Sequence, residues 1–130
     1  MTVRIAVGQT PLTASLDEAV PAAVAAVEEA GRLGAQVLCL PETCLPGHRS
    51  QPRQVPDYAA AEIDAAVETV AAAAGRAGVV TIVGAERPTP AGREIVAAVV
   101  GADGSRLGVQ AKQDVAGLTW AEAVKRLVIV

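Results

Sequence analysis

The 130-residue sequence contains no phenylalanine, one tyrosine (Tyr58) and one tryptophan (Trp120). Aromatic residues make up 2% of the chain and hydrophobic residues 52%, so a core has to be built from valine, leucine, isoleucine and alanine. Small side chains allow close packing of secondary-structure elements but give little stacking surface. The length and apolar content are those of a single domain with a core of its own.

Positive charge is also scarce. The formal net charge is -3, and the lysines and arginines form no cluster along the sequence. This composition gives no electrostatic footprint for nucleic acid or for an anionic membrane surface. No uninterrupted apolar run is long enough to span a bilayer, and Arg4 interrupts the first one, which does not fit a signal peptide. We therefore expect a cytoplasmic protein with no nucleic-acid or membrane partner.

The sequence is poor in residues that bind metals or form disulfides. Its two cysteines, Cys39 and Cys44, are too few for a disulfide framework, and a single histidine, His48, gives no zinc-binding spacing. Both cysteines are expected to be reduced thiols. The glycine-rich segment 101–104 is not followed by a predicted helix, so it indicates a hairpin turn rather than a phosphate-binding loop. We expect no cofactor and no metal.

Residues 36–48, with the sequence Gln-Val-Leu-Cys-Leu-Pro-Glu-Thr-Cys-Leu-Pro-Gly-His, are the most informative stretch of the chain. Its apolar run, residues 37–40, is typical of a strand that is covered on both faces in a mostly parallel sheet. Pro41 ends the strand, and Pro46-Gly47 indicates a turn. Glu42 is therefore predicted at the carboxyl end of a buried strand, where ligands of open α/β sheets usually bind.

A first strand is predicted over residues 3–9, followed by a first helix rich in alanine. Ser15 and Glu18 have the spacing of a capping box, but Pro21 favours Asp17 as the true N-cap, because that would place the proline in the first turn. This helix is predicted to end near Arg32 and Gly34.

A second helix is predicted after the polar, proline-containing segment 49–56. Asp57 is the expected N-cap, and Gly75 and Gly78 are expected to end the helix. Its apolar stripe consists of Ile63, Val67, Val70 and Ala74.

Three further strands are predicted over residues 79–85, 94–100 and 107–111. The first two are expected to be joined by a loop over residues 87–92, and the last two by a hairpin turn at Asp103-Gly104. Residues 119–130 begin with helix-compatible residues and end in an apolar run that indicates the start of another strand. The order predicts an α/β fold with one mixed sheet and two long helices on one face. The other face is expected to be apolar and uncovered.

These elements, in this order, resemble the nitrilase or carbon-nitrogen hydrolase superfamily from Val3 to Lys112. The resemblance rests on Leu40-Pro41-Glu42, the Pro46-Gly47 turn, a second helix that ends in glycine, the strand over residues 79–86, and the hairpin that leads to Lys112. It implies half of a four-layer α-β-β-α sandwich and a Glu-Lys-Cys triad. Glu42 would be the general base, Lys112 would stabilise the oxyanion, and the nucleophilic cysteine would lie beyond the end of this sequence.

Without that resemblance, each of these residues also has a structural explanation. Glu42 could be a solvated carboxylate at a strand end, or could pair with an arginine such as Arg49. Lys112 could be an ordinary surface lysine. Cys44 is two residues from Glu42, on the same side of an extended segment, which seldom gives the geometry between a base and a thiol. His48 has no acidic partner nearby in the sequence and is expected in a loop or at a pocket rim.

The sequence thus predicts residues 1–130 to be a partial carbon-nitrogen hydrolase domain, an N-terminal half that is inactive by itself. The completed protein would hydrolyse an amide, carbamoyl or nitrile substrate. Partners would be copies of the chain in a homo-oligomer or a complementing second half that carries the cysteine. The alternative is a small α/β module that binds a partner or self-associates through its uncovered sheet face.

Overall fold

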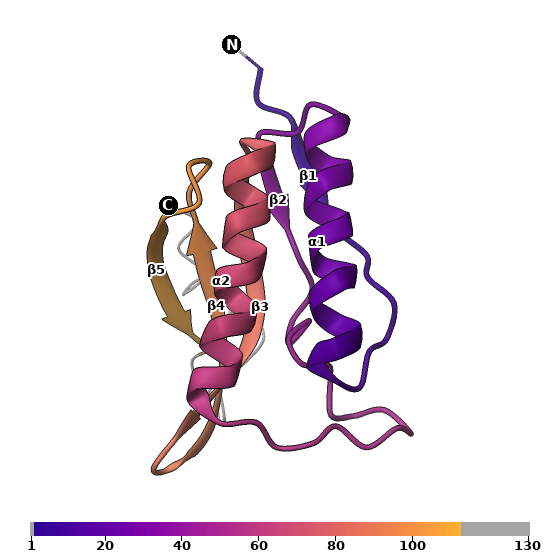
Figure 1. Cartoon of the computed structure of the whole chain (residues 1–130), viewed down its shortest axis with the longest axis vertical. Coiled ribbons are helices and arrows are strands. Elements are labelled where there is room, and N and C mark those ends of the chain that lie inside the picture. Colours follow the sequence, from indigo (N-terminus) through magenta and orange to yellow (C-terminus); the bar gives the residue numbers. More distant parts are fainter. Residues whose placement is uncertain (1, 113–130) are drawn as a thin grey trace, which may run out of the picture.

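A computed structural model describes residues 2–112, which form one five-stranded sheet and two helices (Figure 1). The strand order is β1-β2-β3-β4-β5; the first three strands are parallel and the last three antiparallel. This confirms the predicted α/β fold with a mixed sheet. The predicted elements in residues 119–130 lie outside the described residues. The elements are β1 (Ile5–Val7), α1 (Leu16–Arg32), β2 (Val37–Cys39), α2 (Ala60–Ala77), β3 (Val80–Thr89), β4 (Gly92–Val100) and β5 (Arg106–Ala111).

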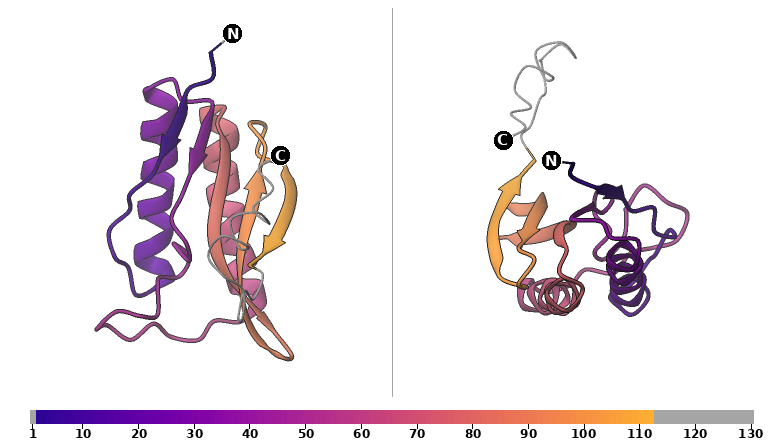
Figure 2. Two further views of the ribbon diagram at one scale, coloured as in Figure 1. Left: turned by 180° about the vertical axis from the view of Figure 1, so that it is seen from behind. Right: turned by 90° about the horizontal axis from the view of Figure 1, so that it is seen from above.

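Both helices cover the same face of the sheet, as the view from above shows (Figure 2). The core between helices and sheet consists of small aliphatic side chains, among them Val27, Leu38, Val70 and Val83. The two helices approach closely where a Cβ atom built at Gly31 would lie 3.0 Å from the Cβ of Ala77. The small residues at this contact therefore allow the two helices to pack closely.

The opposite face of the sheet has no helix over it in residues 2–112. Along β1, Ile5 and Val7 point to this face and are 65% and 84% exposed. Val37, Ile82 and Ile95 in the neighbouring strands are only partly buried. The predicted apolar, uncovered face is therefore present in this part of the chain.

The predicted N-cap of α1, Asp17, is wrong. Ser15 caps the helix, because its backbone is extended and its side chain accepts a hydrogen bond from the Glu18 amide. Pro21 consequently lies inside the helix, where it cannot donate to the Asp17 carbonyl. Both residues are exposed, so water can satisfy that carbonyl.

The predicted N-cap of α2, Asp57, is also wrong. The helix begins after Ala59, whose amide donates to Glu62 Oε2 at 2.7 Å. Asp57 pairs instead with two arginines, which are described below. Gly78 ends the helix in a left-handed conformation, as predicted, but Gly75 lies inside it. The missing side chain of Gly75 lets the β4–β5 hairpin approach, because a Cβ there would lie 3.0 Å from the Asp103 carbonyl oxygen.

Strands β3 and β4 are longer than predicted. Most of the segment that we expected to be a loop continues the pairing out to Thr89 and Gly92. Across this extension, Arg87 Nε donates to Glu94 Oε2 at 2.9 Å and the Thr89 hydroxyl donates to the Gly92 carbonyl. These cross-strand contacts stabilise a hairpin that contains Pro88 and Pro90.

Candidate active site

Glu42 lies on a short excursion of the chain out of the sheet. The Leu40 amide donates to the Ile82 carbonyl at 2.9 Å, which continues the β2–β3 ladder past the end of β2. The chain then leaves the sheet at Pro41 and returns at Leu45, which bridges to Ala85 in parallel fashion. The residues on either side of the excursion, Leu40 and Leu45, both pair with β3. The Glu42 side chain is therefore placed at the carboxyl edge of the sheet, as predicted.

Gly84 makes this excursion possible. A Cβ atom at position 84 would lie 2.1 Å from the Pro41 carbonyl oxygen and 2.9 Å from the Thr43 amide nitrogen. Any side chain there would push the segment that carries Glu42 away from the sheet. Thr43 has a φ of 46°, a left-handed conformation that is rare for a β-branched residue. Such local strain occurs preferentially at functional sites.

Lys112 reaches Glu42 although the two residues are 70 positions apart. Its Nζ lies 2.7 Å from Glu42 Oε1. The Lys112 amide donates to the Ile95 carbonyl at 2.8 Å, which fixes the residue directly after β5. The two side chains are 59% and 43% exposed, so the pair contributes little to stability. The two residues that the sequence singled out thus form one polar pair at the surface.

Cys44 is close to Glu42 in sequence but belongs to the core. It is 7% exposed, and its Sγ donates to the Gly84 carbonyl oxygen at 3.1 Å. Burial raises the pKa of this thiol to about 12, although the hydrogen bond to Gly84 lowers it. A thiol is nucleophilic as the thiolate, so this environment suits an inert structural cysteine.

We expect Cys44 to resist alkylation. The raised pKa of about 12 leaves only about one thiol in ten thousand ionised at pH 8, roughly a thousandfold less than the reference value of 9.0 allows. The rate should rise about tenfold per pH unit, because the thiolate fraction does. Mass spectrometry of a Cys39→Ser variant treated with iodoacetamide measures this rate, and the same reaction in urea is the control. Equal rates in the folded and unfolded chain would contradict the expectation.

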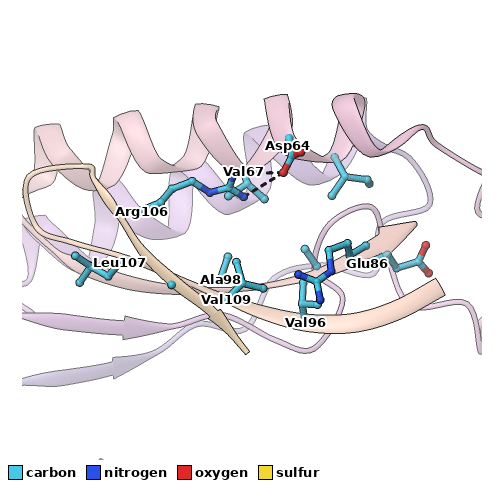
Figure 3. Close-up of a pocket in the computed structure, with 12 residues that line it drawn as sticks. Asp64, Val67, Glu86, Val96, Ala98, Arg106, Leu107 and Val109 are labelled. Atoms are coloured by element: carbon cyan, nitrogen blue, oxygen red, sulfur yellow. Dashed lines mark hydrogen bonds and ion pairs between the residues drawn. The ribbon is translucent and has the colours of Figure 1, made fainter. Parts of the chain in front are cut away.

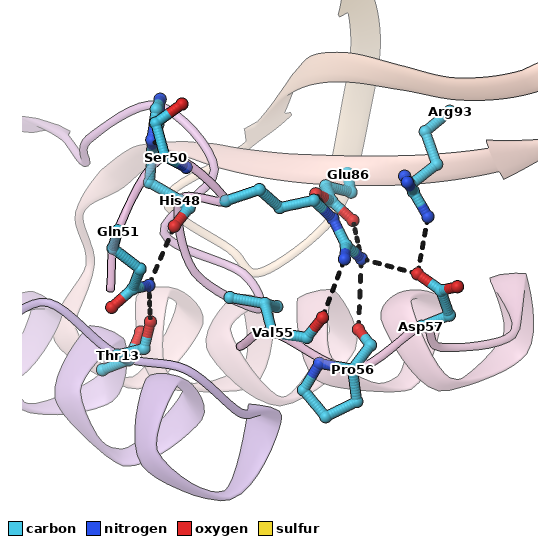
Figure 4. Close-up of polar contacts among 10 residues, drawn as sticks. Thr13, His48, Ser50, Gln51, Val55, Pro56, Asp57, Glu86 and Arg93 are labelled. Carbon is cyan, nitrogen blue, oxygen red and sulfur yellow. Dashed lines mark hydrogen bonds and ion pairs between the residues drawn. The ribbon is translucent and has the colours of Figure 1, made fainter. Parts of the chain in front are cut away.

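Arg49 makes several polar contacts near the excursion, and its partners Glu86, Val55, Pro56 and Asp57 are labelled in Figure 4. Its Nε and Nη2 donate to the two carboxylate oxygens of Glu86 at 2.7 and 3.0 Å. It also donates to the carbonyls of Val55 and Pro56. The Glu86 carboxylate raises the pKa of the Arg49 guanidinium, which stays charged. The alternative that Arg49 pairs with Glu42 is therefore wrong: Arg49 pairs with Asp57 and with Glu86, which sequence reasoning did not single out.

A second set of ion pairs surrounds this contact. Asp57 Oδ1 lies 3.1 Å from Arg49 Nη2 and 2.5 Å from Arg93 Nη1. The carboxylate that we expected to cap α2 thus links the loop before that helix to β4. Only the fold could reveal this role, because Arg93 is 36 positions away.

His48 is nearer to Glu42 than the sequence suggested. Its Nε2 lies 4.0 Å from Glu42 Oε2, and the two side chains are 44% and 43% exposed. His48 and Thr43 also line a cavity of about 270 Å³ with Arg49, Ser50, Glu86, Arg93 and Ile95. Within residues 2–112, the buried hydroxyl of Thr43 has no hydrogen-bond partner.

A larger cavity of about 440 Å³ lies between α2 and strands β3 to β5 (Figure 3). Its apolar wall includes Val67, Val96 and Ala98, and an ion pair between Arg106 and Asp64 borders it. Neither Glu42 nor Lys112 lines this cavity. We therefore place the candidate site at the Glu42–Lys112 pair, because the chemically competent groups meet there.

Across residues 2–112, His, Cys, Asp and Glu side chains form no group of three or more that could hold a metal ion. Neither α1 nor α2 has the length and apolar character needed to cross a membrane.

Comparison with known proteins identifies a family and similar solved structures. Residues 4–126 match the model of the family described as carbon-nitrogen hydrolase. Two similar solved structures are those of an amidase from Nesterenkonia sp., with 24% identity and a TM-score of 0.70, and of a variant of the Nesterenkonia sp. AN1 amidase in complex with butyramide, with 25% identity and a TM-score of 0.71. No curated protein matches the chain.

The alignment with these structures covers most of this chain and less than half of the relatives. It includes 85% of the present chain and 42% of each amidase chain. The sheet and helices described above therefore correspond to about half of the amidase fold.

Proposed function

The chain belongs to the carbon-nitrogen hydrolase family, whose model it matches over residues 4–126, and from this we propose that it supplies two of the three catalytic groups of an amide hydrolase. Glu42 is the general base and Lys112 is the cation that stabilises the oxyanion. The observation that supports both roles is the 2.7 Å contact between Lys112 Nζ and Glu42 Oε1. It joins a carboxylate after β2 to an ammonium after β5.

The proposed reaction has two steps. In the first, Glu42 accepts the proton of a cysteine thiol while the sulfur forms a bond to the amide carbon, and Lys112 stabilises the negative oxygen of the tetrahedral intermediate. The proton passes to the departing amine as the C–N bond breaks. In the second step, water attacks the thioester and Glu42 accepts a proton from that water. Glu42 returns the proton to the sulfur as the C–S bond breaks, so the carboxylic acid is released and the thiol is restored.

The thiol is proposed to come from outside the 130 residues. The sequence has only Cys39 and Cys44, and Cys44 is a buried, un-ionised thiol. Cys39 is partly buried within β2, and its Sγ contacts the carbonyl oxygen of Leu40. We propose that residues 1–130 form a partial domain, and that a second half completes the sandwich over the apolar sheet face and brings the nucleophile to Glu42.

Short aliphatic amides are the proposed substrates. The Nesterenkonia sp. AN1 amidase has been solved in complex with butyramide. Acrylamide and the acetamide moiety of fluoroacetamide have been observed bonded to its active-site cysteine. We infer the same class of small amide for the completed form of this chain.

An assembly experiment tests the proposal. Residues 1–130 alone are expected to show no hydrolysis of butyramide or acetamide. Co-expression with the cysteine-bearing remainder of the Nesterenkonia amidase should give a complex that releases ammonia. Size-exclusion chromatography verifies assembly before the assay. A well-assembled complex without turnover would contradict the proposal, and so would turnover by the isolated chain that is lost in Cys44→Ala.

The uncovered sheet face also favours a second candidate function, a non-catalytic interaction module. Ile5 and Val7 give this face the apolar character of an association surface. Light scattering distinguishes the two functions, since a defined dimer or tetramer of the isolated chain supports the module.

A further inference from the structure

We infer that His48 is a positioning residue for Glu42. This role rests on the proposed function of Glu42 as the base, but the contact between the two side chains stands independently of it. His48 Nε2 lies 4.0 Å from Glu42 Oε2, whereas Lys112 contacts the other carboxylate oxygen, Oε1. The family resemblance pointed to Glu42 and Lys112 only.

The backbone of His48 is held by contacts to the segment before α1. Gly47 has a φ of 145°, and a Cβ there would lie 2.0 Å from the Thr13 carbonyl oxygen. Gln51 Nε2 donates to the carbonyls of both Thr13 and His48, at 2.7 and 2.8 Å (Figure 4). The Thr13 hydroxyl in turn donates to the Pro46 carbonyl. The loop is therefore anchored both before and after His48 in the sequence.

The ring itself is oriented by a backbone donor. The Ser50 amide donates to His48 Nδ1 at 3.2 Å. A neutral imidazole that accepts at Nδ1 carries its proton on Nε2. The nitrogen that faces Glu42 is thus the one that bears hydrogen, so the ring presents an N–H donor to Oε2.

The other charged groups beside the ring have partners of their own. Glu86, Arg49 and Arg93 line the same cavity, but both Glu86 carboxylate oxygens accept from Arg49, and Arg93 donates to Asp57. Lys112 reaches Oε1 of the same carboxylate. Glu42 is therefore the acidic group toward which Nε2 is directed.

The separation of 4.0 Å explains what the ring does in this state. It exceeds the length of a hydrogen bond, so the ring occupies neither lone pair of Oε2 in this state. Oε1 is engaged by Lys112, so the thiol proton is accepted at Oε2. A small rotation of either side chain would then bring Nε2–H into hydrogen-bond range, and catalytic contacts of this kind are often long in the absence of substrate.

Nitrogen NMR of residues 1–130 tests the contact, because His48 is the only histidine and gives the only imidazole signals. At pH 8 the ring should carry its proton on Nε2. Glu42→Gln should move the Nε2 resonance more than the Nδ1 resonance, and Glu42→Asp should change it in the same direction. Glu18→Gln, which alters a carboxylate bound to Arg53, is the matched control and should move neither.

The amide spectrum of each variant verifies that the chain is folded. A proton on Nδ1, or an Nε2 resonance that does not respond to Glu42→Gln, would overturn the inference. These outcomes concern the isolated chain, so they can be separated from a failure of the assembled complex to hydrolyse amides.

The assembled complex gives a functional readout. His48→Gln places an amide N–H near the position of Nε2, whereas the shorter His48→Asn does not reach it. We expect His48→Gln to retain most of kcat and His48→Asn to lose about tenfold with little change in KM, because a misplaced base slows the chemical step. Equal kcat values for both variants and the parent complex would refute the positioning role.

Discussion

Glu42→Gln is expected to lower the rate of amide hydrolysis by the assembled complex by about a thousandfold. General acid–base catalysis contributes roughly 10²- to 10⁴-fold, and a glutamine amide cannot accept the thiol proton. The side chain is 43% exposed and glutamine has the same shape, so the fold should be retained. Ammonia release under saturating butyramide measures kcat, and the urea midpoint of the variant chain reports on its folding.

The control for this prediction is Glu18→Gln. Glu18 is also an exposed glutamate that pairs with a basic side chain, Arg53, but it lies in the first turn of α1. Its replacement should leave kcat unchanged. Glu42→Gln with a kcat near that of the parent complex would show that another group takes the proton.

Arg49→Met is expected to destabilise residues 1–130 by about 3–5 kcal/mol. Methionine fills much of the space of arginine but removes every donor to Glu86, whose side chain is 8% exposed. A buried carboxylate without its partner incurs the full cost of desolvation. The carbonyls of Val55 and Pro56 lose their donors as well. Urea unfolding, followed by circular dichroism, gives the change in the free energy of unfolding.

Two further variants test whether the unpaired Glu86 carboxylate causes the loss of stability in Arg49→Met. In Arg49→Met/Glu86→Met both charges are absent, so the double variant should recover a large part of the lost stability. Arg53→Met is the matched control, because its partner Glu18 is at the surface and such pairs contribute little. A double variant as unstable as Arg49→Met would show that the carbonyl contacts, and not the buried carboxylate, account for the loss.

The sequence predicted the secondary structure best where the pattern was long and periodic. The apolar stripe of α2 and the alanine-rich α1 gave both helices, and the apolar run over residues 37–40 gave β2. Predictions failed at helix starts. Ser15, Asp17 and Asp57 are all acceptable caps by residue type, and only contacts with other parts of the chain decide among them.

The functional residues also differ in whether a local sequence pattern predicts them. Glu42 was predictable, because a carboxylate after a buried strand is a local pattern. Lys112 was singled out only through the family resemblance, and no local pattern predicts that it reaches Glu42. Their contact depends on the register of β4 and β5 and on the excursion over Gly84.

The sequence by itself therefore determined the α/β class, the order of its elements, the apolar uncovered face and the position of Glu42, because these depend on periodicity and turn residues that act over a few positions. Only the tertiary structure decided which charges meet: Glu42 with Lys112, Arg49 with Glu86, and His48 beside Glu42. The physical reason is that side chains 37 or 70 positions apart meet only after strand pairing and loop packing have placed their backbones.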